Sequence, residues 1–129
     1  MMIKNTPKDT ENRLLDAINK GDLEAALACY ETQAVSVVEP GVVVIGTTAI
    51  RETLAGLLSL KPTFKSDQHQ VLETGDIALF MSQWSMRGTD PAGNPVEYNN
   101  QRSADILRCQ PDGNWLIVID NPLGTDILG

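Results

Sequence analysis

The chain of 129 residues is poor in the residues that build metal, redox and disulfide sites. It has one histidine, His69, and two cysteines, Cys29 and Cys109, that lie far apart in the sequence. A structural zinc site needs several nitrogen or sulfur ligands, and a disulfide framework needs paired cysteines. We therefore predict no metal site, and we interpret both cysteines as reduced, buried, small hydrophobic residues.

Long apolar runs and an excess of basic residues are also missing. The purely apolar runs, such as residues 42–45, 77–81 and 115–119, are the size of a strand and far below the roughly 18 residues of a membrane helix. The first ten residues are polar and contain no apolar export signal. The net charge is −7 and the ten Lys and Arg residues are scattered, which argues against nucleic-acid binding. We predict a cytoplasmic protein that binds neither nucleic acid nor membranes.

The common nucleotide and hydrolase motifs are absent from the sequence. Residues 41–48 imitate a phosphate-binding loop, but Thr47 stands where that loop requires a lysine. The sequence has no Gly-x-Gly-x-x-Gly fingerprint, no Gly-x-Ser-x-Gly nucleophile elbow and no His-Glu-x-x-His zinc motif. These absences remove the most frequent cofactor and nucleophile chemistries from consideration.

Helix signals fill the first part of the chain. A first helix is predicted over residues 7–20, with Thr6 as its N-cap and Gly21 directly after its end. Asp22 is placed to cap a second helix, whose apolar stripe extends to Tyr30. The two helices are expected to pack through their apolar faces.

Strand signals dominate the remainder. Residues 35–39 and 42–45 predict a short hairpin, followed by a third helix that begins after Thr47 or Thr48 and ends before Pro62. Three turn signals rich in Gly, Pro, Asp and Asn then separate four runs of similar length. These runs predict strands near residues 64–73, 77–87, 96–109 and 115–121.

This order of elements predicts a single α+β domain over residues 1–129. Its cone-shaped, curved antiparallel sheet, with about four long strands and a short hairpin, is expected to wrap around three N-terminal helices and leave room for a small molecule. Several strands are apolar on both faces, as in residues 77–86. Since the helices cover only one face, we predict a homodimer formed through the sheets.

Three acidic residues on predicted strands are candidates for acid–base chemistry. Glu39 ends an apolar strand, where partial desolvation would raise the pKa of its carboxyl toward that of a useful base. The alternative is a solvated turn carboxylate. Asp120 ends a strongly apolar strand and is either functional or a turn-forming residue that bonds nearby backbone. Asp105 is either functional, paired with Arg102 or Arg108, or exposed to water.

Polar and aromatic side chains on the strands are candidates for substrate binding. Alternation along residues 96–109 places Tyr98, Asn100 and Arg102 on one face. If that face is internal, the three form a polar wall for an oxygen-bearing ligand, and if it is external they are rim or dimer residues. Phe80 and Trp84 share a strand face that either belongs to the core or floors a pocket. We add Tyr30 to this set of substrate-binding candidates.

Three segments carry a resemblance to a known family. They are Asn-Lys-Gly-Asp-Leu-Glu-Ala at residues 19–25, Gly-Thr-Thr-Ala-Ile-Arg-Glu at residues 46–52 and Gln-Pro-Asp-Gly-Asn-Trp-Leu-Ile-Val-Ile-Asp-Asn-Pro at residues 110–122. Together with the Glu-Pro hairpin, their order resembles the nuclear transport factor two-like superfamily, and its SnoaL-like and ketosteroid-isomerase-like branch above all. The resemblance covers about residues 10–123.

The resemblance implies roles for individual residues. Glu39 precedes Pro40 where ketosteroid isomerases place an aspartate general base. Asp105 falls near the position of their second acid, whereas Leu14 occupies the position of their helix-one tyrosine. Asp120 matches the late acid that SnoaL-like cyclases use for proton transfer. The departure at Leu14 counts against steroid isomerisation.

Two functions of different classes follow. The first is a cofactor-independent isomerase, cyclase or dehydratase that acts on a small hydrophobic carbonyl compound. Glu39 or Asp120 would abstract a proton next to the carbonyl, while Asn100, Arg102 or protonated Asp105 would stabilise the enolate oxygen. The second is a non-catalytic dimeric module that binds a ligand or a partner protein.

Overall fold

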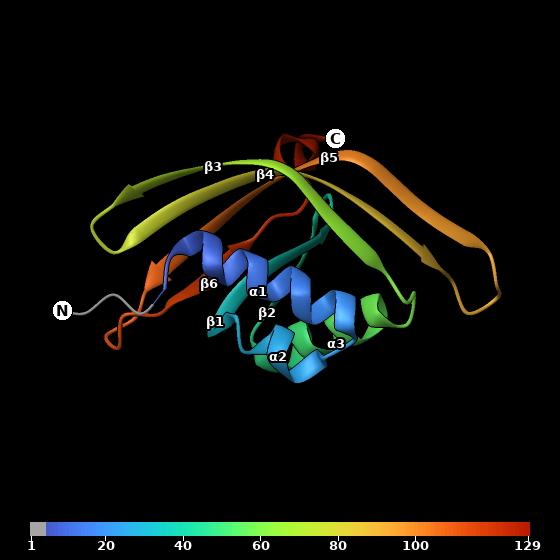
Figure 1. Cartoon of the computed structure of the whole chain (residues 1–129), viewed down its shortest axis with the longest axis horizontal. Coiled ribbons are helices and arrows are strands. Elements are labelled where there is room, and N and C mark those ends of the chain that lie inside the picture. The colour runs from blue at the N-terminus through green and yellow to red at the C-terminus, as the bar shows by residue number, and fades with distance from the viewer. Residues whose placement is uncertain (1–4) are drawn as a thin grey trace.

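The computed structural model describes residues 5–129 and places a curved sheet over a layer of helices (Figure 1). The helices in this range are α1 (Pro7–Lys20), α2 (Leu23–Leu27), α3 (Thr47–Leu58) and the 3-10 helix η1 (Gly124–Leu128). The strands are β1 (Tyr30–Glu39), β2 (Val42–Ile45), β3 (Thr63–Thr74), β4 (Ile77–Thr89), β5 (Pro95–Cys109) and β6 (Trp115–Asp120). The predicted α+β class and the four later strands are confirmed.

The six strands form one sheet in the order β2-β1-β6-β5-β4-β3. Neighbouring strands are antiparallel except β1 and β6, which pair in parallel. The prediction of a wholly antiparallel sheet is therefore wrong at this one pair. Turn residues identify hairpin partners along the sequence, but they carry no information about the direction of a pairing between the first and last strands.

The first helix follows its sequence signals closely. The Thr6 hydroxyl accepts a hydrogen bond from the Asp9 backbone N–H, and the Asp9 carboxylate accepts one from the Thr6 N–H. This reciprocal capping box satisfies two backbone donors at the helix start. Gly21 ends the helix with a φ of 74°, a left-handed conformation that glycine adopts without steric cost. The predicted bounds of α1 are confirmed.

The second and third helices differ from prediction. The second ends at Leu27, and Tyr30 begins β1 by pairing with Ile117 instead of continuing a helical stripe. Sheet pairing outweighs the weak helical periodicity there, because five residues form too short a helix to be stable alone. At α3 the N-cap is Gly46, and the hydroxyl of Thr47 donates instead to the Thr32 carbonyl.

The core lies between the helices and the inner face of the sheet. Two contacts of Trp115, the first residue of β6, hold the start of helix α1 against the sheet. The Thr10 hydroxyl donates to the Trp115 carbonyl at 2.6 Å, and the Asn5 Oδ1 accepts from the Trp115 N–H at 2.7 Å. Both contacts are buried. The apolar side chains that fill this layer include Leu14, Ile18, Ile50, Leu54, Phe80, Leu107 and Ile117.

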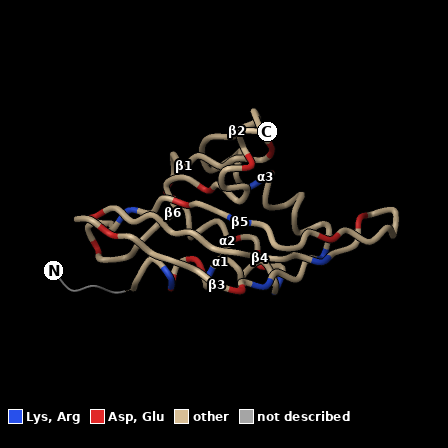
Figure 2. Tube along the Cα trace, turned by 90° about the horizontal axis from the view of Figure 1, so that it is seen from above, with Lys and Arg blue, Asp and Glu red and all other residues tan. Residues whose placement is uncertain are grey.

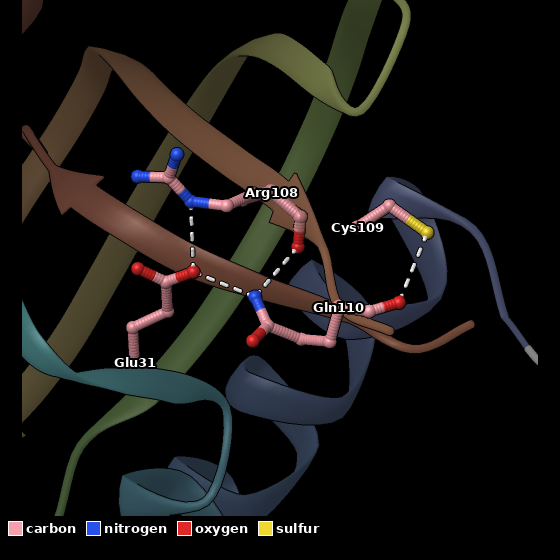
Figure 3. A network of polar contacts seen from close by, with 4 residues as sticks. All are labelled: Glu31, Arg108, Cys109 and Gln110. Atoms are coloured by element: carbon pink, nitrogen blue, oxygen red, sulfur yellow. Dashed lines mark hydrogen bonds and ion pairs between the residues drawn. The ribbon is translucent and has the colours of Figure 1, made fainter. Parts of the chain in front are cut away.

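A polar network joins the start of β1 to the end of β5 (Figure 3). The Glu31 carboxylate accepts hydrogen bonds from Arg108 Nε at 3.0 Å and from Gln110 Nε2 at 2.6 Å. Gln110 Nε2 also donates to the Arg108 carbonyl, and the Cys109 thiol donates to the Gln110 carbonyl. Since successive strand residues point to opposite faces, anchoring Glu31 outside fixes Tyr30 toward the inside.

A β-bulge interrupts the pairing of β4 with β5. Trp84 pairs with Gln101 and Met86 pairs with Tyr98, so two residues of β5 face one residue of β4. One of the two, Asn100, has a φ of 55°. Bulges of this kind add one residue to a strand and reverse which later side chains point inward. Before the bulge the even-numbered Tyr98 of β5 points inward, whereas after it the odd-numbered residues Gln101, Ser103 and Asp105 do.

The outer face of the sheet carries an apolar row that crosses all six strands. Its members are register neighbours in the order Ile45, Val35, Ile119, Ile106, Leu79 and Leu72. Ile45 is 62% exposed and Leu72 is 58% exposed. Contiguous apolar side chains at exposed positions are unusual on an isolated chain.

Charged side chains are distributed over the periphery of the molecule. Figure 2 shows blue Lys and Arg positions in several separate parts of the trace, interspersed with red Asp and Glu. Within residues 5–129, no helix has the length and apolar character needed to cross a membrane. Both cysteines are free thiols, and the predicted burial holds for Cys29, whereas Cys109 is only half-buried.

Candidate functional site

A cavity of about 390 Å³ lies between α1, α3 and the inner face of the sheet. Most of its wall is apolar and includes Leu14, Ile50, Phe80 and Trp84. Its size falls within the range of pockets that enclose a small organic molecule. The cavity therefore has the shape and lining of a site for a hydrophobic ligand.

Three carboxyl groups and the phenol of Tyr30 lie together on the wall of this cavity. Glu11 comes from α1, Tyr30 from β1, Asp105 from β5 and Asp120 from the end of β6. The Tyr30 hydroxyl donates a hydrogen bond to Asp120 Oδ2 at 2.5 Å. Glu11 and Asp105 share a hydrogen bond, as do Asp105 and Asp120. We call these four residues the carboxyl cluster.

Strand register brings Asp105 and Asp120 together. Ile106 of β5 pairs with Ile119 of β6 in an antiparallel ladder, which places the adjacent residues Asp105 and Asp120 side by side. The backbone N–H of Asn121 donates to Asp105 Oδ1 at 2.8 Å and holds that carboxyl in place. Two acids that are 15 positions apart in sequence therefore face the same cavity.

Burial acts strongly on Glu11, which is only 8% exposed. Loss of hydration raises the pKa of its carboxyl from 4.5 to about 7, because the charged form is poorly solvated there. The hydrogen bond with Asp105 opposes the shift, and the nearby charge of Asp120 adds to it. A carboxyl that titrates near neutral pH is able to act as an acid or a base under physiological conditions.

The other members of the cluster are shifted in the same direction. Burial raises the pKa of Asp105 well above its ordinary value, and the charges of Glu11 and Asp120 reinforce the rise. Burial also raises the pKa of Asp120, but hydrogen bonds from Tyr30 and Asp105 oppose that rise. The pKa of Tyr30 lies well above 10 through burial and the adjacent Asp120 charge, so Tyr30 stays a neutral donor. Asp120 is thus the carboxyl whose ionised form is best supported.

One oxygen of the cluster has no partner. Glu11 Oε2 is buried without a hydrogen-bond donor among the described residues. Buried carboxylate oxygens are normally satisfied, because leaving one unpaired costs free energy. Among residues 5–129, no lysine, arginine or histidine lines the cavity to supply that donor. Glu11 is thus the member of the cluster whose carboxyl is least satisfied by the described residues.

Aromatic rings and the segment after β6 form another part of the wall. The Trp84 indole N–H donates to the Pro122 carbonyl at 3.0 Å, and its ring lies 5.4 Å from Phe64 and 6.4 Å from Tyr98 between centroids. Pro122 and Leu123 both line the cavity. The structure places four of the substrate-binding candidates on the cavity wall: Tyr30, Phe80, Trp84 and Tyr98.

Three other candidates lie away from this cavity. Glu39 is exposed beside the β1–β2 turn and does not line the cavity, so the expected desolvation of its carboxyl is wrong. Asn100 sits on the bulge and accepts a hydrogen bond from Gln83 Nε2 at 3.2 Å. Arg102 lines a separate and more open pocket with His69. The common face predicted for Tyr98, Asn100 and Arg102 is broken by the extra residue of the bulge.

Glu11 was not identified from the sequence, although a signal for it exists. The residue lies three and seven positions before Leu14 and Ile18, on the buried face of α1. A charged residue on the apolar stripe of a helix is rarely buried without a role. The signal was missed because Glu11 lies in the first half of the helix, where most of its neighbours in sequence are polar.

In residues 5–129, no group of three or more His, Cys, Asp or Glu side chains is arranged to hold a metal ion. The carboxyl cluster instead bonds within itself and to Tyr30 and Asn121. Its arrangement is suited to moving protons among neighbouring carboxyl groups.

Comparisons with solved structures find the same fold in other proteins. A nuclear transport factor 2 (NTF2-like) superfamily protein from Salmonella enterica serovar Typhimurium is 19% identical, with a TM-score of 0.78 over 88% of this chain and 84% of that one. A Shewanella frigidimarina protein described as a candidate ketosteroid isomerase is 19% identical, with a TM-score of 0.77 over 91% and 94%. A Mycobacterium tuberculosis protein of unknown function is 22% identical, with a TM-score of 0.74 over 88% and 66%.

Comparisons of the sequence alone find one family model and no curated protein. The model of the SnoaL-like domain family matches residues 12–118, which includes most of the helical layer and nearly the whole sheet. The match and the shared fold agree with the resemblance seen in the sequence. The chain therefore belongs to the SnoaL-like domain family.

Proposed function

We propose that the chain is a cofactor-independent acid–base enzyme that isomerises, cyclises or dehydrates a small hydrophobic carbonyl compound. The observation that carries the proposal is the carboxyl cluster itself, three carboxyl groups and a phenol in one apolar cavity. Packing alone gives no reason to bury three acids together, because their burial costs free energy. Neighbouring carboxyl groups with raised pKa values are typical of proton-transfer sites.

The contacts favour distinct roles for the three acids. Asp120 is assigned as the base, because the Tyr30 hydroxyl stabilises its carboxylate at 2.5 Å. Asp105 and Glu11 are assigned as acids, because burial raises the pKa of both carboxyls and keeps them protonated more readily. A protonated carboxyl donates a hydrogen bond to a carbonyl oxygen and stabilises the charge that develops there.

The reaction then proceeds in two proton transfers. Asp120 removes a proton from the carbon next to the carbonyl, and the electron pair of that C–H bond forms a carbon–carbon double bond as the oxygen becomes an enolate. Asp105 or Glu11 donates a hydrogen bond to that oxygen. Return of the proton at another carbon gives an isomer, and departure of a β-hydroxyl protonated by Glu11 gives an alkene and water.

The first step is tested without knowing the final product. The chain is incubated in D₂O with a panel of hydrophobic ketones, and deuterium uptake at the carbon next to the carbonyl is followed by NMR. We expect uptake above the buffer rate for some ketones, and a fall of at least about a hundredfold in D120N, the range typical of losing a general base. Glu39→Gln is the matched control, since it removes one exposed carboxylate outside the cavity.

Two results would contradict the proposal. Equal uptake in wild type, D120N and E11Q would remove the carboxyl cluster from the chemistry. Binding of several ketones with no uptake in any of them would favour the alternative, a module that binds ligands without converting them. The structural neighbour described as a candidate ketosteroid isomerase is consistent with the catalytic version.

A further inference from the structure

The charge of the cavity wall is one-sided. Glu11, Asp105 and Asp120 line the cavity, whereas no Lys, Arg or His of residues 5–129 does. The remaining polar lining consists of neutral groups such as Ser36, Ser103 and Gln101. An anionic ligand would therefore meet carboxylates without any compensating cation.

The second observation is the unpaired oxygen of Glu11. Its side chain is more than nine-tenths buried, lines the cavity, and leaves Oε2 without a donor. The donors near it are already engaged, because the Tyr30 hydroxyl donates to Asp120 and the Asn121 N–H donates to Asp105. The deep part of the cavity is thus rich in acceptors and short of donors.

We propose that the cavity binds a hydrophobic molecule that carries a protonated amine, with the ammonium group against the carboxyl groups of Glu11 and Asp120. An ammonium group supplies three donors and a positive charge, which the acidic wall lacks. Hydrogen bonds between ionised partners are about twice as strong as neutral ones. The apolar body of the ligand would lie against Leu14, Phe80 and Trp84.

This proposal goes beyond the proposed function, because it concerns equilibrium binding and not turnover. A protonated Glu11 donates to a carbonyl oxygen, whereas an ionised Glu11 accepts from an ammonium group. Amine binding therefore drives a proton off the carboxyl cluster. Selective amine binding is compatible with either result of the deuterium experiment, and loss of amine selectivity would leave the deuterium result unaffected.

The titratable groups around Glu11 set the direction of the proton change. They are Asp105 on β5, Asp120 on β6, and Tyr30 and Cys29 at the start of β1. Tyr30 and Cys29 remain protonated near neutral pH, since burial raises the pKa of both. The pKa of Glu11 is about 7, so most of this carboxyl is protonated at pH 6 and releases its proton to the solvent when an ammonium group binds.

The test uses three ligands of nearly equal shape: 2-naphthylmethylamine, 2-naphthylmethanol and 2-naphthoate. Isothermal titration calorimetry at pH 6 in two buffers of different ionisation enthalpy gives the affinity and the protons released. We expect the amine to bind at least about tenfold more tightly than the alcohol, with proton release, and the carboxylate to bind more weakly than both. The wild-type chain alone provides this readout.

Variants then locate the effect. E11Q should lower the affinity ratio of amine to alcohol and reduce proton release, while alcohol binding is retained as evidence of an intact cavity. E39Q carries the same loss of charge outside the cavity and should keep the full ratio. Equal amine and alcohol affinities in wild type, no amine binding at all, or an unchanged ratio in E11Q would each overturn the proposal.

Discussion

At the scale of single residues, Glu11 links the chemistry of the cavity to the stability of the chain. The pKa of its carboxyl is about 7 in the folded chain and 4.5 when freely hydrated. Between these pH values the folded chain holds a proton that the unfolded chain has lost, so the free energy of unfolding falls as pH rises through this window. A shift of this size corresponds to about 3 kcal/mol.

We therefore expect the wild-type chain to be less stable at pH 8 than at pH 5. Urea unfolding at the two pH values measures the difference. In E11Q the destabilisation on raising the pH should shrink by up to about 3 kcal/mol, leaving the part that Asp105 and Asp120 contribute in the same direction. E39Q should show the same pH dependence of stability as wild type. If E11Q also shows the same pH dependence as wild type, the raised pKa of Glu11 is contradicted.

Individual site residues were only partly predictable from the sequence. Asp105 and Asp120 were recognised because a carboxylate within an apolar strand stands out against its neighbours. Glu39 has the same local signal, yet it is exposed, because the sequence does not reveal that the β1–β2 turn lies outside the cavity. Glu11 was missed because its helix begins with several exposed polar residues. The pattern of apolar and polar residues along the sequence predicts whether a segment is buried better than whether one of its side chains is.

At the scale of elements, the bulge in β5 decides which side chains face the cavity. Asn100 has a φ of 55°, a left-handed conformation that asparagine tolerates and β-branched residues resist. We expect N100V to lower the free energy of unfolding by about 1–2 kcal/mol and N100G to leave it nearly unchanged. Urea unfolding of both variants measures the difference.

The neighbouring asparagine provides the control for this prediction. Asn99 belongs to the same bulge, but it is not among the residues with positive φ. N99V introduces the same side chain at a residue without the left-handed conformation. It should therefore lower the free energy of unfolding clearly less than N100V does. If the two valine variants are equally stable, the conformation of Asn100 does not determine the cost of substitution there.

Elements with strong end signals were predicted accurately. Thr6 and Gly21 bound α1, and Gly-, Pro- and Asp-rich turns bound the strands from β3 to β6. The bulge was not predicted, since no glycine marks it and residues 97–103 are polar throughout, so no apolar alternation reveals a change of face. For this reason the sequence placed Asn100 and Arg102 beside Tyr98, whereas only Tyr98 lines the cavity.

At the scale of the whole molecule, the apolar row on the outer face of the sheet is exposed to solvent in a single chain. We propose that a second copy of this chain packs against it, because a two-fold contact places the row of one copy across the row of the other. The row spans the full width of the sheet, from Ile45 to Leu72. Such a contact would bury the exposed apolar side chains that a monomer leaves in water.

Sedimentation velocity tests this arrangement. We expect a dimer for wild type and a folded monomer for I119K, because Ile119 is 37% exposed near the middle of the row and a lysine there would be buried without a partner. V42K is the control, since Val42 is 42% exposed and lies outside the row. A monomeric wild-type chain, or a dimer that persists in I119K, would contradict the proposal.

The position of β6 has a consequence for how the site comes into being. The β1–β2 and β3–β4–β5 parts of the sheet meet only through β6. Each part can form from strands adjacent in sequence, whereas the hydrogen bond between Tyr30 and Asp120 joins residues 90 positions apart. Contacts of such long range form late, because closing a long loop costs entropy before the contact forms. Asp105 and Asp120 meet within the local β5–β6 hairpin. We therefore expect the carboxyl cluster to be completed late in folding, when Tyr30 of β1 joins that hairpin.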